Sequence, residues 1–351
     1  MAIAKASFTS IFRSPSSTFF SLFFPIVLIV IFGSLGGGGG VSYDIAIDKK
    51  SDTTNAIYQR IVHAPIFDII NSNDADIEDR LRKGRLTAVL SIQKKDSGKY
   101  DLHIRSTTAS AREFPAVENI LNSMIDQASQ QDHPAEKIAS ISRDVAQIRE
   151  YKRIDFYLPG MIGFSLIGSA VFGVAFLFFA LRETLVLKRM YASPVSKTNI
   201  VLGESIGRVL FQLLIVIVLI LFGKYAYGFT LIDGFVTFLE LLVLSTLALI
   251  VFMGFGFFIS SVAKNQNVIP IYANLFMFPQ YFLSGTFFPK SALPKSINWL
   301  IDALPLTSLN DALRKVAFEG SHLGDCWKQM GILAIWGVVI YLLTIKVFRW
   351  E

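Results

Sequence analysis

Six stretches of the chain are almost continuously apolar, and shorter polar segments separate them. Each comes close to the roughly 20 residues that an α-helix needs to cross about 30 Å of hydrocarbon. They lie at about Ser17–Leu35, Phe156–Leu181, Arg208–Phe229, Phe235–Ser260, Val268–Phe288 and Met330–Phe348. The pattern predicts an α-helical polytopic membrane protein with six transmembrane helices.

The first apolar stretch resembles a signal peptide only superficially. It is longer than the apolar part of a signal peptide, and the run Gly36–Gly40 follows it where a small-residue cleavage motif would stand. We therefore expect a retained helix whose N-terminus stays in the cytoplasm, followed by a flexible glycine hinge. Residues 1–40 are predicted to hold an amphipathic N-terminal segment and this first transmembrane helix.

The lysines and arginines between the apolar stretches indicate the orientation, because cytoplasmic loops are enriched in them. The loop of residues 182–207 and the turn with Lys264 then lie inside, as does the C-terminus with Lys346 and Arg349. This places both termini on the cytoplasmic side of a bacterial-type plasma membrane. The segment of residues 289–328 would lie outside despite its positive charges, and we expect it to re-enter the membrane in part.

Residues 41–155 differ from the rest because charged residues are frequent and mixed in sign. Alternating or β-branched runs predict strands at about Val41–Asp48, Ile66–Ile70, Leu86–Ile92 and Tyr100–Arg105. Helices are predicted at Thr53–Val62, at Ala75–Lys83 and, interrupted near Pro134, through Ala111–Arg153. The segment is therefore expected to fold as a mixed α/β extracytoplasmic domain inserted between helices 1 and 2.

Composition narrows the function further. Of the 351 residues, 52% are hydrophobic and 17% are charged, and the net charge is +6. The basic residues form no long stripe along the chain, so we expect no nucleic acid partner. The four histidines are isolated and Cys326 is the one cysteine, which argues against a metal site. The sequence has no G-x-x-x-x-G-K-[ST] loop for nucleotide phosphates. We predict neither an enzyme nor a directly bound cofactor.

Several polar residues fall within the apolar stretches, where an unpaired polar group is costly. Glu240 is expected near the outer interface, where it either pairs with Lys224 or lines a polar cavity. Asn274 and Gln280 lie in the fifth stretch, between two prolines that predict a kink. Together these three residues are candidates for a translocation path.

The loop of residues 182–207 carries a sharper pattern. An acidic start, a cationic pair and a Ser-Pro break suggest a short helix, a turn and a second helix that together form a docking surface. An ordinary solvated connector is the alternative. The residues concerned are Arg182, Glu183, Lys188, Arg189, Ser193, Pro194 and Glu204.

Three segments are similar to the membrane subunits of type-2 ABC exporters. The loop contains K-R-M followed by A-S-P-V-S, and F-Y-L-P-G at Phe156–Gly160 resembles the family's start of the second crossing. The most specific match is F-L-S-G-T-F-F-P with P-L-T-S-L-N-D-A-L-R, within Phe282–Arg314. The resemblance covers almost the whole chain.

The resemblance implies a permease that forms a homodimer or heterodimer and binds two copies of a separate ABC ATPase, which holds ATP and magnesium. The loop from Arg182 to Glu204 would couple to the ATPase, braced by the N-terminal helix. A kinked fifth helix with Gly285 and Pro289 at its outer end would act as a gate. Residues Pro294–Phe318 would form short helices that re-enter from outside.

Two other classes stay open at this stage. A membrane scaffold or signal transmitter would work with an ATPase without moving solute. An intramembrane enzyme would need acid, base or metal groups within the bundle, where Glu240 alone is a candidate. For an exporter, the phenylalanine-rich helices favour an amphipathic or hydrophobic substrate such as a drug or a lipid.

Overall fold

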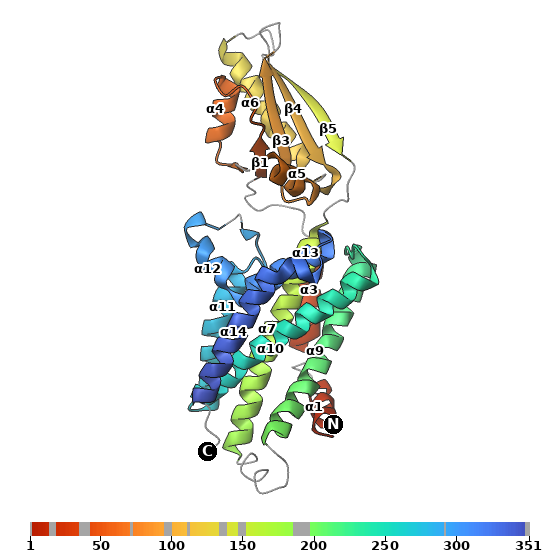
Figure 1. Cartoon of the computed structure of the whole chain (residues 1–351), viewed down its shortest axis with the longest axis vertical. Helices are drawn as coiled ribbons and strands as arrows, with labels where there is room; N and C mark the ends of the chain where they lie inside the picture. The colour runs from red at the N-terminus through yellow and green to blue at the C-terminus, as the bar shows by residue number, and fades with distance from the viewer. Residues whose placement is uncertain are drawn as a thin grey trace. The chain divides into compact units, whose positions relative to one another are not determined.

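The computed structural model describes residues 2–13, 19–34, 43–70, 73–94, 100–110, 113–132, 139–146, 152–184, 197–290 and 293–347. The chain divides into two compact units (Figure 1). Unit 1 comprises residues 1–36 and 153–351, and unit 2 comprises residues 37–152.

Unit 1 is a helical bundle. Its N-terminal part consists of α1 (Ala2–Phe12), the short π-helix η1 (Phe19–Phe23) and α3 (Phe24–Ser34). The long helices are α7 (Arg153–Glu183), α9 (Lys197–Tyr227), α10 (Phe235–Val262) and α14 (Trp327–Val347). Shorter helices lie between α10 and α14: η3 (Gln266–Val268), α11 (Ile269–Leu283), η5 (Lys295–Ile297), α12 (Asn298–Ala303), α13 (Pro305–Phe318) and η6 (Leu323–Cys326).

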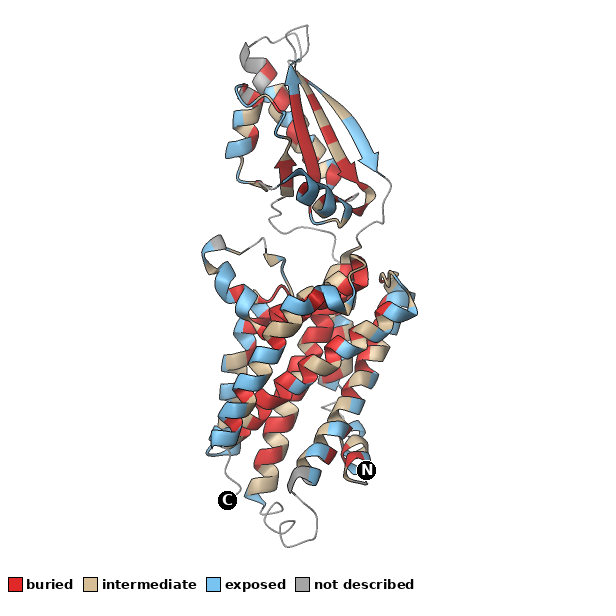
Figure 2. Ribbon diagram, viewed as in Figure 1, coloured by how far each residue is buried: buried red, intermediate tan, exposed pale blue. Residues whose placement is uncertain are grey.

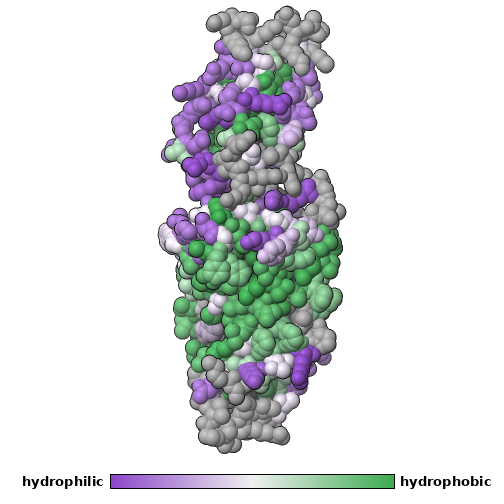
Figure 3. Space-filling model, turned by 90° about the vertical axis from the view of Figure 1, so that its right-hand side faces the viewer, coloured by the Kyte–Doolittle hydropathy of each residue, from purple (hydrophilic) through white to green (hydrophobic). Residues whose placement is uncertain are grey.

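Four helices in the described part of the chain are long and apolar enough to cross a membrane. They span Arg153–Glu183, Val201–Tyr227, Phe235–Val262 and Leu323–Val347. Hydrophobic side chains cover the bundle face shown in Figure 3, as expected for helices whose solvent is lipid. The first and fifth predicted crossings also form helices, but these are shorter than predicted.

The helix boundaries correct the sequence-based expectations at two places. Helix α9 begins at Lys197 rather than near Arg208, so the second half of the 182–207 loop is part of a continuous helix. Helix α11 ends at Leu283 rather than Phe288, because Gly285 takes a positive φ of 73° that breaks the helix. At 15 residues, α11 is about 22 Å long, which is less than the hydrocarbon thickness.

The core of unit 1 lies along α7, α10 and α13, in which more than half of the residues are buried (Figure 2). Glycines let neighbouring backbones approach closely there. A Cβ at Gly256 would lie 2.7 Å from Cβ of Val174, and one at Gly254 would lie 2.6 Å from Cγ2 of Ile340. Small residues at such positions are typical of helix packing in membranes, where van der Waals contact replaces the hydrophobic effect.

Helix α1 packs on the N-terminal half of α9 through the spacing Gly203-x-x-x-Gly207. A Cβ at Gly203 would lie 2.8 Å from Cβ of Ile3, and one at Gly207 would lie 2.7 Å from the Ala4 carbonyl oxygen. The two helices therefore touch nearly backbone to backbone. The N-terminal amphipathic segment is thus a docked helix of the bundle.

Unit 2 contains a five-stranded mixed sheet in the order β2-β1-β3-β4-β5. The strands are β1 (Tyr43–Ile47), β2 (Phe67–Ile69), β3 (Ala88–Lys94), β4 (Tyr100–Thr107) and β5 (Ala139–Ala146), and the helices are α4 (Ala56–His63), α5 (Asp74–Arg82), η2 (Thr108–Ser110) and α6 (Phe114–Asp132). β3 and β4 pair antiparallel, whereas the other neighbouring strands pair parallel. One sheet face packs on α4 and α6 around Ile45, Leu90 and Ile104, and α5 covers part of the other through Ile77 and Leu81.

Strand β5 corrects the expectation of a helix after Pro134. It pairs in parallel with β4 along its full length, from Tyr100 opposite Ala139 to Thr107 opposite Ala146. Ala139 and Ile141 contribute to the α6 side of the core, and Arg143 forms an ion pair with Glu118 of α6 (Nη2–Oε1 2.5 Å). This alternation of inward and outward side chains has the period of a strand.

Candidate functional site

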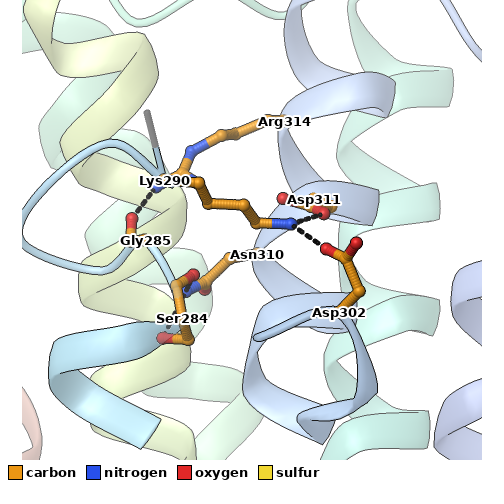
Figure 4. A network of polar contacts seen from close by, with 7 residues as sticks. All are labelled: Ser284, Gly285, Lys290, Asp302, Asn310, Asp311 and Arg314. Atoms are coloured by element: carbon orange, nitrogen blue, oxygen red, sulfur yellow. Dashed lines mark hydrogen bonds and ion pairs between the residues drawn. The ribbon is translucent and has the colours of Figure 1, made fainter. Parts of the chain in front are cut away.

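Arg314 of α13 joins two of the three segments that carry family-like motifs, and Figure 4 shows its contact with Gly285. Its guanidinium donates to the Phe156 carbonyl oxygen through Nε (3.3 Å) and Nη2 (3.1 Å), and Nη2 also donates to the Gly285 carbonyl oxygen. The same guanidinium lies 4.1 Å from the centre of the Phe156 ring, within the range of a cation–π interaction. The start of α7, the turn after α11 and α13 are thereby held together.

Asn310 forms a second layer of this contact, one helical turn earlier in α13. Its Nδ2 donates to the Ser284 carbonyl oxygen (3.2 Å) and to Oγ1 of Thr286 (3.0 Å), and the two hydroxyl groups of Ser284 and Thr286 bond to each other (2.8 Å). All three side chains are fully buried. Buried polar groups that satisfy one another fix a single arrangement of the turn.

Two glycines of α7 make this approach possible. A Cβ at Gly160 would lie 2.6 Å from the Thr286 carbonyl oxygen, and one at Gly163 would lie 2.5 Å from Oδ1 of Asn310. Oδ1 of Asn310 has no hydrogen bond among the described residues, and it occupies the space that a side chain at position 163 would need. We call Phe156, Gly160, Ser284–Thr286, Asn310 and Arg314 the α7–α13 clamp.

Lys290 forms two ion pairs next to the α7–α13 clamp. Its Nζ lies 2.5 Å from Oδ2 of Asp311 in α13 and 3.2 Å from Oδ1 of Asp302 in α12 (Figure 4). The carbonyl oxygen of Gly285, a predicted gate residue, therefore accepts a hydrogen bond from Arg314. Pro289, the other predicted gate residue, is exposed and precedes Lys290.

Gln280, a predicted path residue, is buried and bonds within the same region. Its Oε1 accepts a hydrogen bond from the Leu306 backbone N–H (3.1 Å), and its Nε2 donates to the Phe276 carbonyl oxygen (3.5 Å). Leu306 lies in the first turn of α13, where backbone N–H groups lack partners within their own helix. Gln280 therefore caps α13 from α11. Asn274, on the same helix, is half-buried.

The expectation that Glu240 pairs with Lys224 is wrong. Oε1 of Glu240 lies 3.2 Å from Nδ1 of His322 and accepts from the Leu323 backbone N–H (3.3 Å), whereas Lys224 is exposed. Oε2 of Glu240 is buried without a hydrogen bond among the described residues. The carboxylate thus ties α10 to the connection between α13 and α14.

The predicted coupling segment is described at its two ends. Nη2 of Arg182 donates to the Ala263 carbonyl oxygen at the end of α10 (2.8 Å), Glu183 is the exposed last residue of α7, and Glu204 is half-buried in α9. Lys188, Arg189, Ser193 and Pro194 lie outside the described residues. The bond of Arg182 links the start of the segment to the turn between α10 and α11.

Sequence reasoning missed two buried polar links. Asp155 accepts hydrogen bonds from the backbone N–H (2.8 Å) and hydroxyl (3.2 Å) of Thr230. Nε2 of Gln212 donates to Oγ of Ser165 (2.8 Å), which donates to the Ser21 carbonyl oxygen in η1 (2.6 Å). The signal for both was a polar residue within or beside an apolar run, which indicates a bonded partner but not its identity.

The buried polar contacts of this region join helices to one another. Among the residues that the structure describes, no three His, Cys, Asp or Glu side chains are placed to hold a metal ion. The buried polar groups instead connect α7, α11 and α13 at one end of the bundle. A bundle with several long apolar helices is compatible with a polytopic membrane protein.

The comparison with known families identifies that class. The chain belongs to the ABC-2 transporter family, because the model described as ABC-2 family transporter protein matches residues 15–346. It is 23% identical over 369 aligned positions to ABC transporter G family member 20 of Dictyostelium discoideum, covering 99% of this chain and 50% of the relative. The chain therefore spans half the length of that protein.

Two bacterial relatives are permeases by name. The linearmycin resistance permease protein LnrN of Bacillus subtilis is 20% identical over 385 positions, with 99% of each chain covered. The probable multidrug ABC transporter permease YbhR of Escherichia coli is 23% identical over 154 positions, covering 44% of this chain and 41% of the relative. The chain is thus similar to membrane subunits of ABC transporters.

Proposed function

We propose that this chain is the permease subunit of an ATP-driven exporter and that it works with a separate ABC ATPase. The observation that carries the proposal is the ABC-2 family match across residues 15–346. The α7–α13 clamp supports it, since a transporter needs helices that move as joined bodies. ATP and magnesium would be bound by the partner, and this chain would supply the path.

We propose six crossings, formed by η1 with α3, α7, α9, α10, α11 with the turn after it, and α14. Unit 2 would then face the outside of a bacterial-type plasma membrane, with both termini in the cytoplasm. Arg182, Lys264 and Lys346 would all lie on the cytoplasmic side, which agrees with the positive-inside rule. Helices α12 and α13 would form the outer re-entrant segment.

Coupling would run through residues 182–207. Because α9 is continuous from Lys197, a push on the segment would act directly on a helix that extends to Tyr227. Helix α1 packs on Gly203 and Gly207 and would support α9 during this movement. Arg182 would pass the movement to the end of α10 through its hydrogen bond to the Ala263 carbonyl oxygen. Two ATPase copies would act on a dimer of permeases, made of identical or related chains.

The substrate path would be shaped by Glu240 near the outer end of α10, by Asn274 and Gln280 within α11, and by Gly285 and Pro289 after the outer end of α11. Gln280 and Gly285 are bonded to α13, so the gate would move together with that helix. The substrate would be amphipathic or hydrophobic. Relatives named for linearmycin resistance and for multidrug transport support this choice.

The experiment is co-purification from the native host in mild detergent, followed by mass spectrometry. We expect the wild type to recover an ATPase with a Walker motif, and the variant Lys188→Glu/Arg189→Glu to lose it. The matched control is Lys49→Glu/Lys50→Glu, which reverses two exposed cations of unit 2 and should retain the partner. If crosslinking yields no ATPase with any of the three proteins, the proposal is wrong.

A further inference from the structure

Helix α1 has two faces of opposite character. Ile3, Ala4 and Ser7 face α9, where they contact Gly203 and Gly207, and Phe8 lies against Phe211 with ring centres 6.2 Å apart. The opposite face is open and carries Lys5, Ala6, Thr9, Ser10 and Arg13. One side of the helix is therefore committed to the bundle, and the other is not.

This open face of α1 carries the chemistry of an anion site. Lys5, Thr9 and Arg13 are spaced four residues apart, which sets two cations on the same helix face with hydroxyl groups between them. The Thr9 hydroxyl donates to the Lys5 carbonyl oxygen (2.8 Å), so its proton is already in use. The exposed Ser10 hydroxyl and the two cationic groups are left as donors to a ligand.

Phenylalanines are exposed on α1 and on η1, the next described helix. The side chain of Phe12 is 59% exposed, and in the following π-helix Phe19 and Phe23 are 50% and 54% exposed. Phe8 stacks on Phe12 and Phe19 stacks on Phe23, at 6.4 and 6.1 Å between ring centres. Cations beside exposed aromatic rings match a ligand that has a charged end and an apolar end.

We propose that this face of α1 binds the phosphate headgroup of an anionic membrane lipid, with the acyl chains lying along Phe12, Phe19 and Phe23. The inference rests on the proposed function in one respect, that unit 1 spans a bilayer. A lipid bound there would hold α1 against α9 and so stabilise the helix that carries the coupling segment. Each basic residue near an anionic surface contributes about 1 kcal/mol to binding, so losing both should weaken it about thirty-fold.

The test is native mass spectrometry of the purified chain with equal amounts of phosphatidylglycerol and phosphatidylcholine. We expect the wild type to retain phosphatidylglycerol preferentially and Lys5→Gln/Arg13→Gln to bind it about thirty-fold more weakly. The control Lys49→Gln/Lys50→Gln removes the same charge from unit 2 and should behave as the wild type. Excess inorganic phosphate should leave the lipid in place, and displacement by it would show a site for free phosphate instead.

Two further outcomes overturn the inference. Unchanged phosphatidylglycerol retention in Lys5→Gln/Arg13→Gln would show that the lipid binds elsewhere. If Lys5→Gln/Arg13→Gln no longer co-purifies the ATPase but retains the lipid as the wild type does, this face of α1 binds the protein partner instead. If the wild type recovers no ATPase while the variant still loses the lipid, the proposed function fails and the lipid site stands.

Discussion

At the scale of single residues, the clamp depends on positions where a side chain is absent. Gly160 and Gly163 let α7 reach the Ser284–Thr286 turn, and Arg314 then bonds backbone oxygens that a bulkier contact would keep apart. Overpacking a site of this kind costs about 1–3 kcal/mol, because neither backbone can move independently.

We expect Gly160→Ala to lower the stability of the purified protein by about 1–3 kcal/mol, since its Cβ would meet the Thr286 carbonyl oxygen at 2.6 Å. The matched control is Gly331→Ala in α14, where a Cβ has nothing within 4 Å and alanine favours the helix by up to about 1 kcal/mol. Differential scanning fluorimetry in one detergent compares them. Equal melting temperatures for Gly160→Ala and the wild type would refute the packing argument.

The sequence predicted which polar residues are unusual better than it predicted their partners. Glu240, Gln280 and Arg314 stood out from their apolar surroundings or matched a motif. Their partners are His322, the Leu306 backbone and two backbone carbonyls, all distant in sequence and brought near by helix packing. A backbone acceptor leaves no mark on composition, so these contacts were outside the reach of pattern reasoning.

At the scale of elements, the long apolar helices were all predicted, because their signal is summed over many positions, but the start of α9 was placed eleven residues too late. Helix α10 begins at Phe235 in both the prediction and the structure. Strand β5 was missed because it is an edge strand with five exposed residues, Ser140 and Arg143–Ala146, and only two that face the core. Its identity comes from pairing with β4, which no local pattern contains.

Strand β5 should be required for the fold of unit 2. We expect a fragment of residues 41–147 to unfold cooperatively in urea, because a sheet with helices on it has its own core. A fragment ending at residue 133 should be markedly less stable, since it exposes the β4 edge and loses Ala139 and Ile141 from the core. Circular dichroism during urea titration measures both. Identical midpoints would show that β5 is dispensable.

The close packing of α1 on α9 can also be tested. Gly207→Val should displace α1, because the new side chain would overlap the Ala4 backbone. We expect the α1 amides to exchange hydrogen at least tenfold faster in the variant. Gly331→Val is the control, since it places the same residue in open space on α14. Unchanged α1 protection in Gly207→Val would mean that the close contact does not hold the helix.

At the scale of the whole molecule, the two units differ in the polarity of their surfaces. Unit 1 exposes apolar side chains and unit 2 has mixed charges around a sheet, so one sequence contains both a lipid-facing and a water-facing part. This division was predictable from composition alone. The substrate path was not, because in the proposed dimer it would depend on surfaces between copies of the chain.

The proposed topology predicts which sites a membrane-impermeant maleimide reaches in intact cells. Lys49→Cys in unit 2 should be labelled from outside, whereas Lys264→Cys in the turn after α10 should be labelled after permeabilisation only. The native Cys326 is buried and provides a low background. Labelling of both sites in intact cells would contradict a six-crossing arrangement with unit 2 outside.

The central claim is that this chain moves an amphipathic solute when its partner hydrolyses ATP. The most direct measurement is uptake of a fluorescent amphipathic probe into inside-out proteoliposomes that hold the permease with its co-purified ATPase. We predict uptake that requires ATP, and ATP hydrolysis that the probe stimulates. A series of such probes that neither accumulate nor change the hydrolysis rate, despite an active ATPase, would contradict transport and favour a signal transmitter.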